Sequence, residues 1–206
     1  MRKLWGRANS VNVQKALWAL EELGEPYERV EAGGAFGVVN DPAFLALNPN
    51  GLVPVLEEDG FALWESNAIL RHLAETGGAA LALPEAPRER ARVHQWLDWQ
   101  ATAFTLAMRD AFLQSFRFKP ADRDQALIAA SAARSERCAE ILDRHLNGRD
   151  FMVGERFGIA DIAVACAAYR WLNIPVDPKP RPNVARWLDR LAERPASACV
   201  LGQPLS

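Results

Sequence analysis

Apolar positions in the first part of the chain follow two different periods. Short runs typical of strands cover residues 2–6, 26–30, 53–56 and 61–63. Residues 12–23 instead repeat apolar side chains every three or four positions, which is typical of a helix, and Gly24 follows as a common C-terminal stop. Asp41-Pro42 predicts the start of a short helix, and Glu65-Ser66 predicts the start of another.

The order of these elements predicts an α/β domain of the form βαβ-α-ββα. A parallel βαβ unit joined to an antiparallel hairpin forms a mixed four-stranded sheet with helices on both faces, the outline of a thioredoxin-like domain. Glu58-Asp59-Gly60 is the hairpin turn signal. Pro54 has no amide to donate, so we expect it at the start or edge of a strand.

The rest of the chain is predicted to be all-α. Gly and Pro interrupt the periodicity over residues 77–87, which indicates a linker, and long helices are expected at 87–116 and 122–147. Residues 158–169 are nearly all apolar, which predicts a helix buried on all sides. Asp161 lies in its first turn, where we expect a structural role. The expected domains are residues 1–78 and 88–206, joined by a linker at 79–87.

Composition and charge narrow the function classes. The chain has 206 residues and a formal net charge of −2, which gives no indication of nucleic-acid binding. No apolar run is long enough for a signal peptide or a membrane span, so we expect a cytoplasmic protein that contacts no membrane. Cys138, Cys166 and Cys199 are widely separated, which favours reduced thiols and neither a disulfide framework nor a metal site.

The segment around Pro54 has a pattern that suits a peptide-like ligand. If the bond before Pro54 is cis, the Val53 backbone turns outward, where its N–H and C=O can pair with an extended peptide. Ser66 at a helix N-terminus offers a hydroxyl and free amides to a carboxylate. A peptide edge beside a carboxylate pocket would suit glutathione.

The same residues resemble those of the glutathione transferase superfamily. Val53-Pro54 matches the family's Val-Pro pair with a cis proline, and Glu65-Ser66-Asn67-Ala68-Ile69 matches the segment that binds the γ-glutamyl end of glutathione. The resemblance extends along the whole chain and implies a two-domain bacterial transferase similar to Nu- and theta-type members. It implies that Leu52, Val53, Pro54, Glu65 and Ser66 bind glutathione, with no metal.

Leu52 departs from the family pattern. Many relatives carry Lys or Arg at this position, where the cation meets the glycyl carboxylate of glutathione. A lost charge-assisted bond there would weaken binding by something like 1 kcal/mol, unless another cation such as Arg7 replaces it.

The resemblance places thiol activation at Ser10 and Asn12. Ser10 falls where serine-type members keep their activating hydroxyl, and Ser-x-Asn-x-x-Lys resembles the Thr-Pro-Asn-x-x-Lys of Nu-class and yeast prion-like relatives. A thiol pKa of about 8.5 leaves little thiolate at neutral pH, so a hydrogen bond to sulfur at the positive end of a helix favours the anion. The alternative is that Ser10 or Asn12 serves only as an N-cap.

The substrate is less well specified. In the resembling family, the loop after the first strand and the helical domain form the electrophile site. The resemblance implies four candidates to line it, namely Phe36, Phe104, Met108 and Phe112. Residues of these types at such positions are more often part of the core than contacts to a substrate. An apolar lining would suit a small hydrophobic electrophile or an organic peroxide.

Three function classes follow from the sequence. They are glutathione transfer to an electrophile, glutathione-dependent reduction of disulfides or peroxides, and a non-catalytic binding or regulatory role that Leu52 would favour. The resemblance also implies a homodimer, with Asp98 a candidate to approach the partner's glutathione.

Overall fold

The computed structural model describes residues 1–205 and divides into two compact units. The first unit is Met1–Leu83 and the second begins at Pro84, so the division falls inside the segment 79–87 where the linker is expected. Each unit has its own secondary structure and is described separately.

The first unit contains a mixed four-stranded sheet, as the sequence predicted. Its strands run in the order β2-β1-β3-β4, with β1 parallel to β2 and antiparallel to β3, and with β3 antiparallel to β4. The strands are β1 (Arg2–Trp5), β2 (Tyr27–Val30), β3 (Val55–Glu58) and β4 (Phe61–Trp64). Strand β3 was expected at 53–56 but begins two residues later, because Pro54 has no amide for the ladder.

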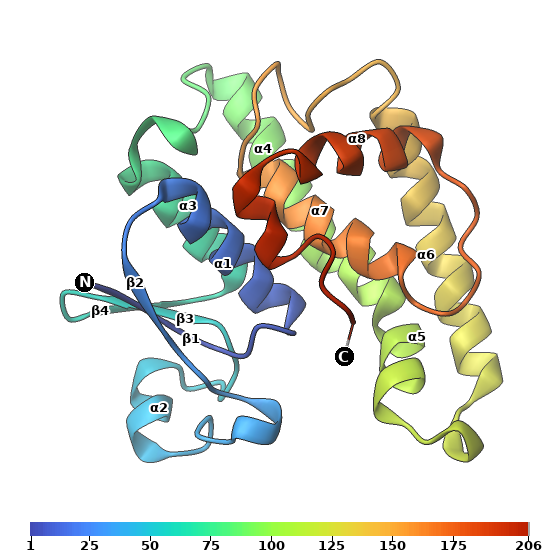
Figure 1. Cartoon of the computed structure of the whole chain (residues 1–206), viewed down its shortest axis with the longest axis horizontal. Helices are drawn as coiled ribbons and strands as arrows, with labels where there is room; N and C mark the ends of the chain where they lie inside the picture. Colours follow the sequence, from blue (N-terminus) through green and yellow to red (C-terminus); the bar gives the residue numbers. More distant parts are fainter. Residues whose placement is uncertain (206) are drawn as a thin grey trace. The chain divides into compact units, whose positions relative to one another are not determined.

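Helices cover both faces of this sheet. Helices α1 and α3 pack together on one face, and α2 lies on the other (Figure 1). On the α2 side, Phe44 is buried with Ala32 and Val55, and its ring meets Trp5 edge-on at 5.9 Å. The helices are α1 (Val11–Leu23), α2 (Pro42–Leu47) and α3 (Ser66–Thr76), with short 3₁₀ turns η1 (Gly34–Phe36) and η2 (Gly78–Ala80).

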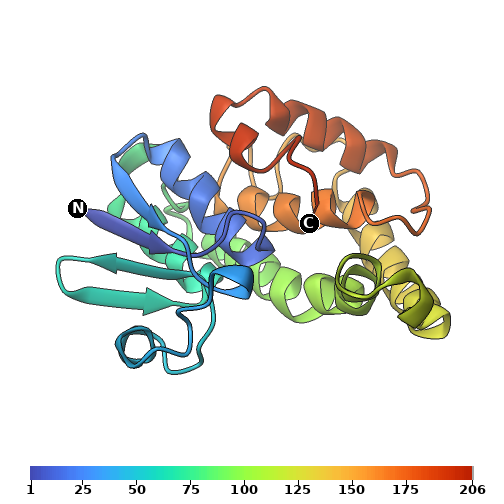
Figure 2. The same cartoon turned by 60° about the horizontal axis from the view of Figure 1, so that its bottom comes forward.

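The position of the hairpin turn shows which end of the sheet holds the other loops. Asp59 and Gly60 both have positive φ, 48° and 82°, as a two-residue type I′ turn requires. This turn and the start of β1 lie at the same end of the sheet (Figure 2). The loops that connect the strands to α1 and α3 are therefore gathered at the opposite end.

The second unit is helical, as expected, and its first long helix contains a π-helical turn. A single helix was predicted over 87–116, whereas residues 100–104 form a π-helical turn η3 between α4 and α5. The elements are α4 (Pro87–Trp99), η3 (Gln100–Phe104), α5 (Thr105–Arg117), η4 (Pro120–Asp122), α6 (Gln125–His145), α7 (Ile159–Leu172), α8 (Pro182–Ala192) and η5 (Pro195–Cys199). No separate element was predicted at α8 or η5, although both lie in the part of the chain that was expected to be helical.

Asp161 is the polar anchor of the buried helix α7. Its carboxylate accepts hydrogen bonds from the Met152 amide at 2.8 Å, the Trp187 indole at 3.0 Å and the Gly158 amide at 3.1 Å. Complete burial raises the pKa of Asp161 to about 7, although the three donors act in the opposite direction. Asp161 thus caps the amide of Gly158 at the start of α7, whereas Gly158 has no side chain that could bond the Asp161 amide in return.

The remaining sequence observations concern cysteines and membranes. Cys138, Cys166 and Cys199 form no disulfide within residues 1–205. Within residues 1–205, no helix has both the length and the apolar character needed to cross a bilayer. The same residues contain no cluster of three or more His, Cys, Asp or Glu side chains that could hold a metal.

Candidate functional site

The strand register brings four loops to one end of the sheet in the first unit. Trp5 pairs with Val55 and also with Val30, and Val55 pairs with Trp64. The segments that leave or enter the sheet beside these pairs must therefore lie at one edge. They are residues 6–10, 31–34, 48–54 and 65–66, which include the predicted Ser10, Val53 and Ser66.

Ser10 and Asn12 lie at the N-terminus of α1. Ser10 occupies the N-cap position, where its carbonyl accepts the Gln14 amide at 2.8 Å, but its hydroxyl makes no capping bond. Within residues 1–205, neither side chain has a hydrogen-bond partner, and both are partly exposed. No acidic residue occupies the first turn of α1. The positive end of this helix is thus open to an anion, with two polar side chains beside it.

Gly33 allows Arg7 to approach Val53. A methyl group at Gly33 would stand 3.2 Å from Nη1 of Arg7 and 3.3 Å from Cγ2 of Val53, tighter than side chains normally pack. Gly33 also has φ of 78°, which favours glycine. The Arg7 guanidinium and the Val53 side chain therefore both lie next to the position that a side chain at residue 33 would occupy.

The peptide bond between Val53 and Pro54 is cis, as the sequence predicted. Pro54 is buried, Val53 is partly exposed, and Leu52 is 64% exposed. Within residues 1–205, the N–H and C=O groups of Val53 make no hydrogen bond. A backbone donor and acceptor are consequently available to a ligand at this edge.

Asn48 holds the loop that precedes Pro54, a role that sequence reasoning missed. Its Nδ2 donates to the Leu52 carbonyl at 2.7 Å, while its Oδ1 accepts from the amide and side chain of Asn50 at 3.0 and 2.9 Å. The side chain is buried. The segment Asn48-Pro-Asn-Gly carried a signal for it, because asparagine in such a stretch often bonds its own loop.

Glu65 and Ser66 form the junction between β4 and α3. Glu65 is the N-cap of α3 and has φ of +69° and ψ of 108°, an unusual conformation for a residue other than glycine. Ser66 is the first helical residue and is only 5% exposed. Its hydroxyl has no hydrogen-bond partner in the described chain, so it remains able to bond a ligand at the α3 N-terminus.

A buried polar contact joins the two helices that bear these residues. Lys15 Nζ donates to Oδ1 of Asn67 at 2.9 Å. Lys15 lies in the second turn of α1 and Asn67 in the first turn of α3, and both are buried. This contact fixes the N-terminus of α3 beside α1, and sequence reasoning did not assign it.

The candidate electrophile residues lie in different environments. Phe36 is 54% exposed in η1 of the first unit. Phe104, Met108 and Phe112 belong to the helical unit and are buried, and the Phe112 ring lies 4.1 Å from the Arg170 guanidinium. A substrate contact for any of the four stays a prediction.

Comparison with known proteins gives matches over both units. Residues 2–75 match the family model for the glutathione S-transferase N-terminal domain, and residues 101–195 match that for the C-terminal domain. The chain is 43% identical over 208 residues to glutathione S-transferase GstB of Escherichia coli K12, with each chain fully covered. It is 34% identical to elongation factor 1-gamma of Danio rerio, over 82% of this chain and 38% of that protein.

A solved structure matches the whole chain closely. The theta class glutathione S-transferase from Xanthomonas axonopodis pv. citri, with glutathione bound, has a TM-score of 0.95 and 41% identity. The match covers 100% of this chain and 99% of that one.

Replacing Asn48 tests how the loop before Pro54 is held. Asn48→Ala would leave the Leu52 carbonyl and the Asn50 amide without their partner, so we expect the free energy of unfolding to fall by about 1–3 kcal/mol. Urea denaturation measures this, and hydrogen exchange should quicken at residues 50–52. Asn50→Ala is the matched control, since it keeps the bond to Leu52 and should cost less. An Asn48→Ala protein as stable as wild type would contradict this role.

Proposed function

This chain belongs to the glutathione S-transferase family, and we propose that its transferase chemistry takes place where the four loops meet in the first unit. The observation that carries this proposal is the free backbone N–H and C=O of Val53 at the same sheet edge as the α1 N-terminus. An extended peptide can pair with such a backbone edge while its thiol reaches the helix.

The two ends of glutathione are assigned to opposite sides of Val53. The γ-glutamyl carboxylate binds the Ser66 hydroxyl and the first amides of α3, and the Glu65 carboxylate takes the α-amino group. The burial and free hydroxyl of Ser66 support this assignment. At the other end, Leu52 offers no charge to the glycyl carboxylate. Arg7 replaces the missing cation, and its place beside Gly33, close to the Val53 side chain, supports this role.

The thiol is activated without a general base. Ser10 or Asn12 donates a hydrogen bond to the glutathione sulfur, and the positive end of α1 favours the thiolate over the thiol. The open side chains of both residues support this role. The thiol proton goes to solvent, and the thiolate attacks an electrophilic carbon to form a carbon–sulfur bond. In a substitution the bond to the leaving group breaks and that group departs with the electron pair; in an addition the resulting carbanion takes a proton from water. Phe36 is the exposed aromatic side chain that we assign to a small hydrophobic electrophile.

Reduction of a disulfide or peroxide is the second candidate activity. The three cysteines of the chain all belong to the second unit, so the first unit supplies no thiol of its own beside Ser10 and Asn12. Two glutathione molecules would then supply both electrons, giving two thiols from the disulfide substrate and one oxidised glutathione.

The cytoplasm, where thiols are kept reduced, is the proposed location of the protein.

Assembly is part of the proposal. We expect a homodimer in which the acidic first unit of one copy meets the basic second unit of the other, and the opposite charges of the two units support this pairing. Light scattering at micromolar concentration should give the mass of a dimer, twice 22.8 kDa per chain. A monomer mass would overturn this expectation and leave the site within one chain unaffected.

The carboxylate pocket is tested by calorimetry. Ser66→Ala should weaken glutathione binding by about 1–3 kcal/mol, because a bond to a charged carboxylate is lost. Glu65→Gln should weaken it as well by removing the charge opposite the α-amino group. The exposed Asn40→Ala is the control, expected to bind like wild type. Unchanged affinity in both site variants would count against this pocket.

The thiolate is tested by the Ser10→Ala, Asn12→Ala double variant. Its turnover at neutral pH with a chloronitrobenzene substrate should fall on the order of ten-fold or more, because the bound thiol loses its donor and its pKa rises. Raising the pH should restore much of the rate, since solvent base then supplies the thiolate. A parallel assay with a model disulfide separates the two candidate activities. Full activity with an unshifted pH profile would assign the thiolate to other donors.

A further inference from the structure

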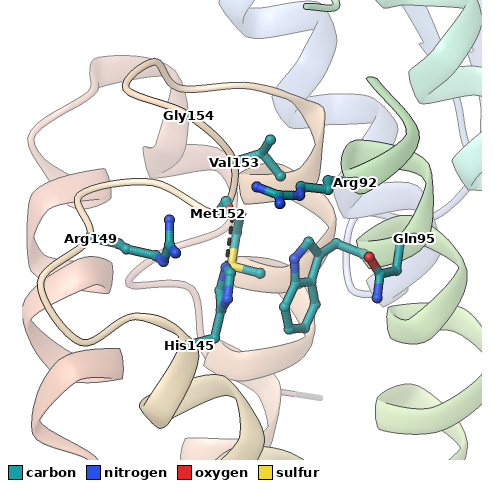
Figure 3. A pocket seen from close by; sticks show the side chains of 8 residues that line it. Arg92, Gln95, His145, Arg149, Met152, Val153 and Gly154 are labelled. Atoms are coloured by element: carbon teal, nitrogen blue, oxygen red, sulfur yellow. Dashed lines mark hydrogen bonds between the residues drawn. The ribbon is translucent and has the colours of Figure 1, made fainter. Parts of the chain in front are cut away.

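The helical unit contains a pocket that the glutathione chemistry does not use. It is a cavity of about 280 Å³ between α4, the end of α6 and the loop that follows (Figure 3). The lining residues that matter here are Arg92 and Trp96 from α4, His145 from α6, and Arg149, Met152 and Val153 from the loop. None of them belongs to the site in the first unit.

The charged side chains that line this pocket are positive. Arg92 and Arg149 lie on opposite sides of Met152, and no acidic side chain lines the cavity (Figure 3). Within residues 1–205, neither guanidinium has an ion pair or a hydrogen bond. The neighbouring Asp150 pairs instead with Arg186 and Arg190. Two cations without counter-ions therefore share one cavity, an arrangement that suits an anion.

The wall between the two arginines is aromatic and uncharged. His145 donates from Nε2 to the Met152 carbonyl at 2.8 Å, and its ring lies 4.4 Å from that of Trp96. Burial lowers the pKa of His145, the hydrogen bond to Met152 acts in the opposite direction, and the nearby Arg149 and Arg92 lower the pKa further, which favours the neutral imidazole. Trp96, Met152 and Val153 add apolar surface. A ligand here meets cations at two sides and flat apolar groups between them.

We propose that this pocket binds a small aromatic anion, an aryl phosphate or aryl carboxylate. The acid group pairs with the guanidiniums of Arg92 and Arg149, while the ring packs against Trp96 and the loop. The volume lies just below the range of about 300–1,000 Å³ usual for drug-sized ligands, so a one-ring compound fits better than a larger one. The apolar wall favours such a compound over a bare inorganic anion.

Calorimetry on the full-length protein tests this proposal with phenyl phosphate and benzoate as probes. Inorganic phosphate carries the charge without the ring, and phenol carries the ring without the charge, so both should bind more weakly than phenyl phosphate. Stronger binding of one aromatic acid than the other identifies the acid group that the pocket prefers. Added salt should weaken the binding, because partly exposed charges are screened.

Variants locate the binding. The Arg92→Gln, Arg149→Gln double variant should weaken phenyl phosphate binding by roughly five-fold or more, as expected for the loss of two exposed charge pairs. Arg88→Gln removes an exposed charge from the same helix outside the lining and should leave the affinity unchanged. Because the chain has only three histidines, NMR can follow His145 directly, and its ring resonance should shift on binding while those of His72 and His94 do not.

The outcomes separate clearly. No binding of either aromatic acid to wild type would overturn the proposal, as would equal affinity in the double variant or equal loss in Arg88→Gln. Transferase activity of the double variant should equal that of wild type. A parallel loss of activity would mean that the arginines serve the glutathione site, which also contradicts an independent pocket.

Discussion

The pairing of β3 with both of its neighbours is the constraint on which the first unit depends. Because side chains alternate along a strand, a shift of one residue would turn Val55 away from Phe44 and move every loop at the sheet edge. Val55 is fully buried against Phe44 and Ala32, so such a shift would expose the core. The same register brings Val53 beside the loops that lead into α1 and α3. Core packing thereby sets the geometry of the site.

Two helix N-termini at one sheet edge give that site its electrostatic character. Helix α1 follows β1 and helix α3 follows β4, and neither has an acidic residue in its first turn. Their positive ends favour two anions, a thiolate at α1 and a carboxylate at α3. The hydrogen bond between Lys15 and Asn67 joins the two helices near these ends. The side chain of Asn48 fixes the loop that precedes Pro54. Ligand chemistry is thus supported by buried polar groups that need not touch the ligand.

Local signals in the sequence were sufficient for most of the first unit. The Asp59-Gly60 turn and the Gly24 stop depend on short-range chemistry, and the structure agrees with both. The cis bond before Pro54 was implied by the resemblance to the transferase family, and the structure has it. The π-turn after Trp99 could not be predicted from periodicity, because it changes the hydrogen-bond ladder without changing the apolar pattern.

Other features depend on contacts between residues far apart in the sequence, with helix α8 as an exception. Arg7 and Val53 come close together because of the strand pairing and because Gly33 has no side chain, and no local sequence pattern predicts this. Helix α8, in contrast, has apolar residues at 184, 187, 188 and 191, a helical spacing after Pro182 that sequence analysis could have recognised. The burial of Phe104 and Met108 depends on helix packing, so composition alone could not separate core from substrate contact.

A crystal structure of the complex with glutathione would test the central claim most directly, namely that the converging loops of the first unit form the site. The account predicts two hydrogen bonds between the Val53 backbone and the cysteinyl unit, and the γ-glutamyl carboxylate at Ser66. It also predicts the sulfur within hydrogen-bond distance of Ser10 or Asn12. Glutathione bound elsewhere, or bound with its sulfur turned away from the α1 N-terminus, would contradict it.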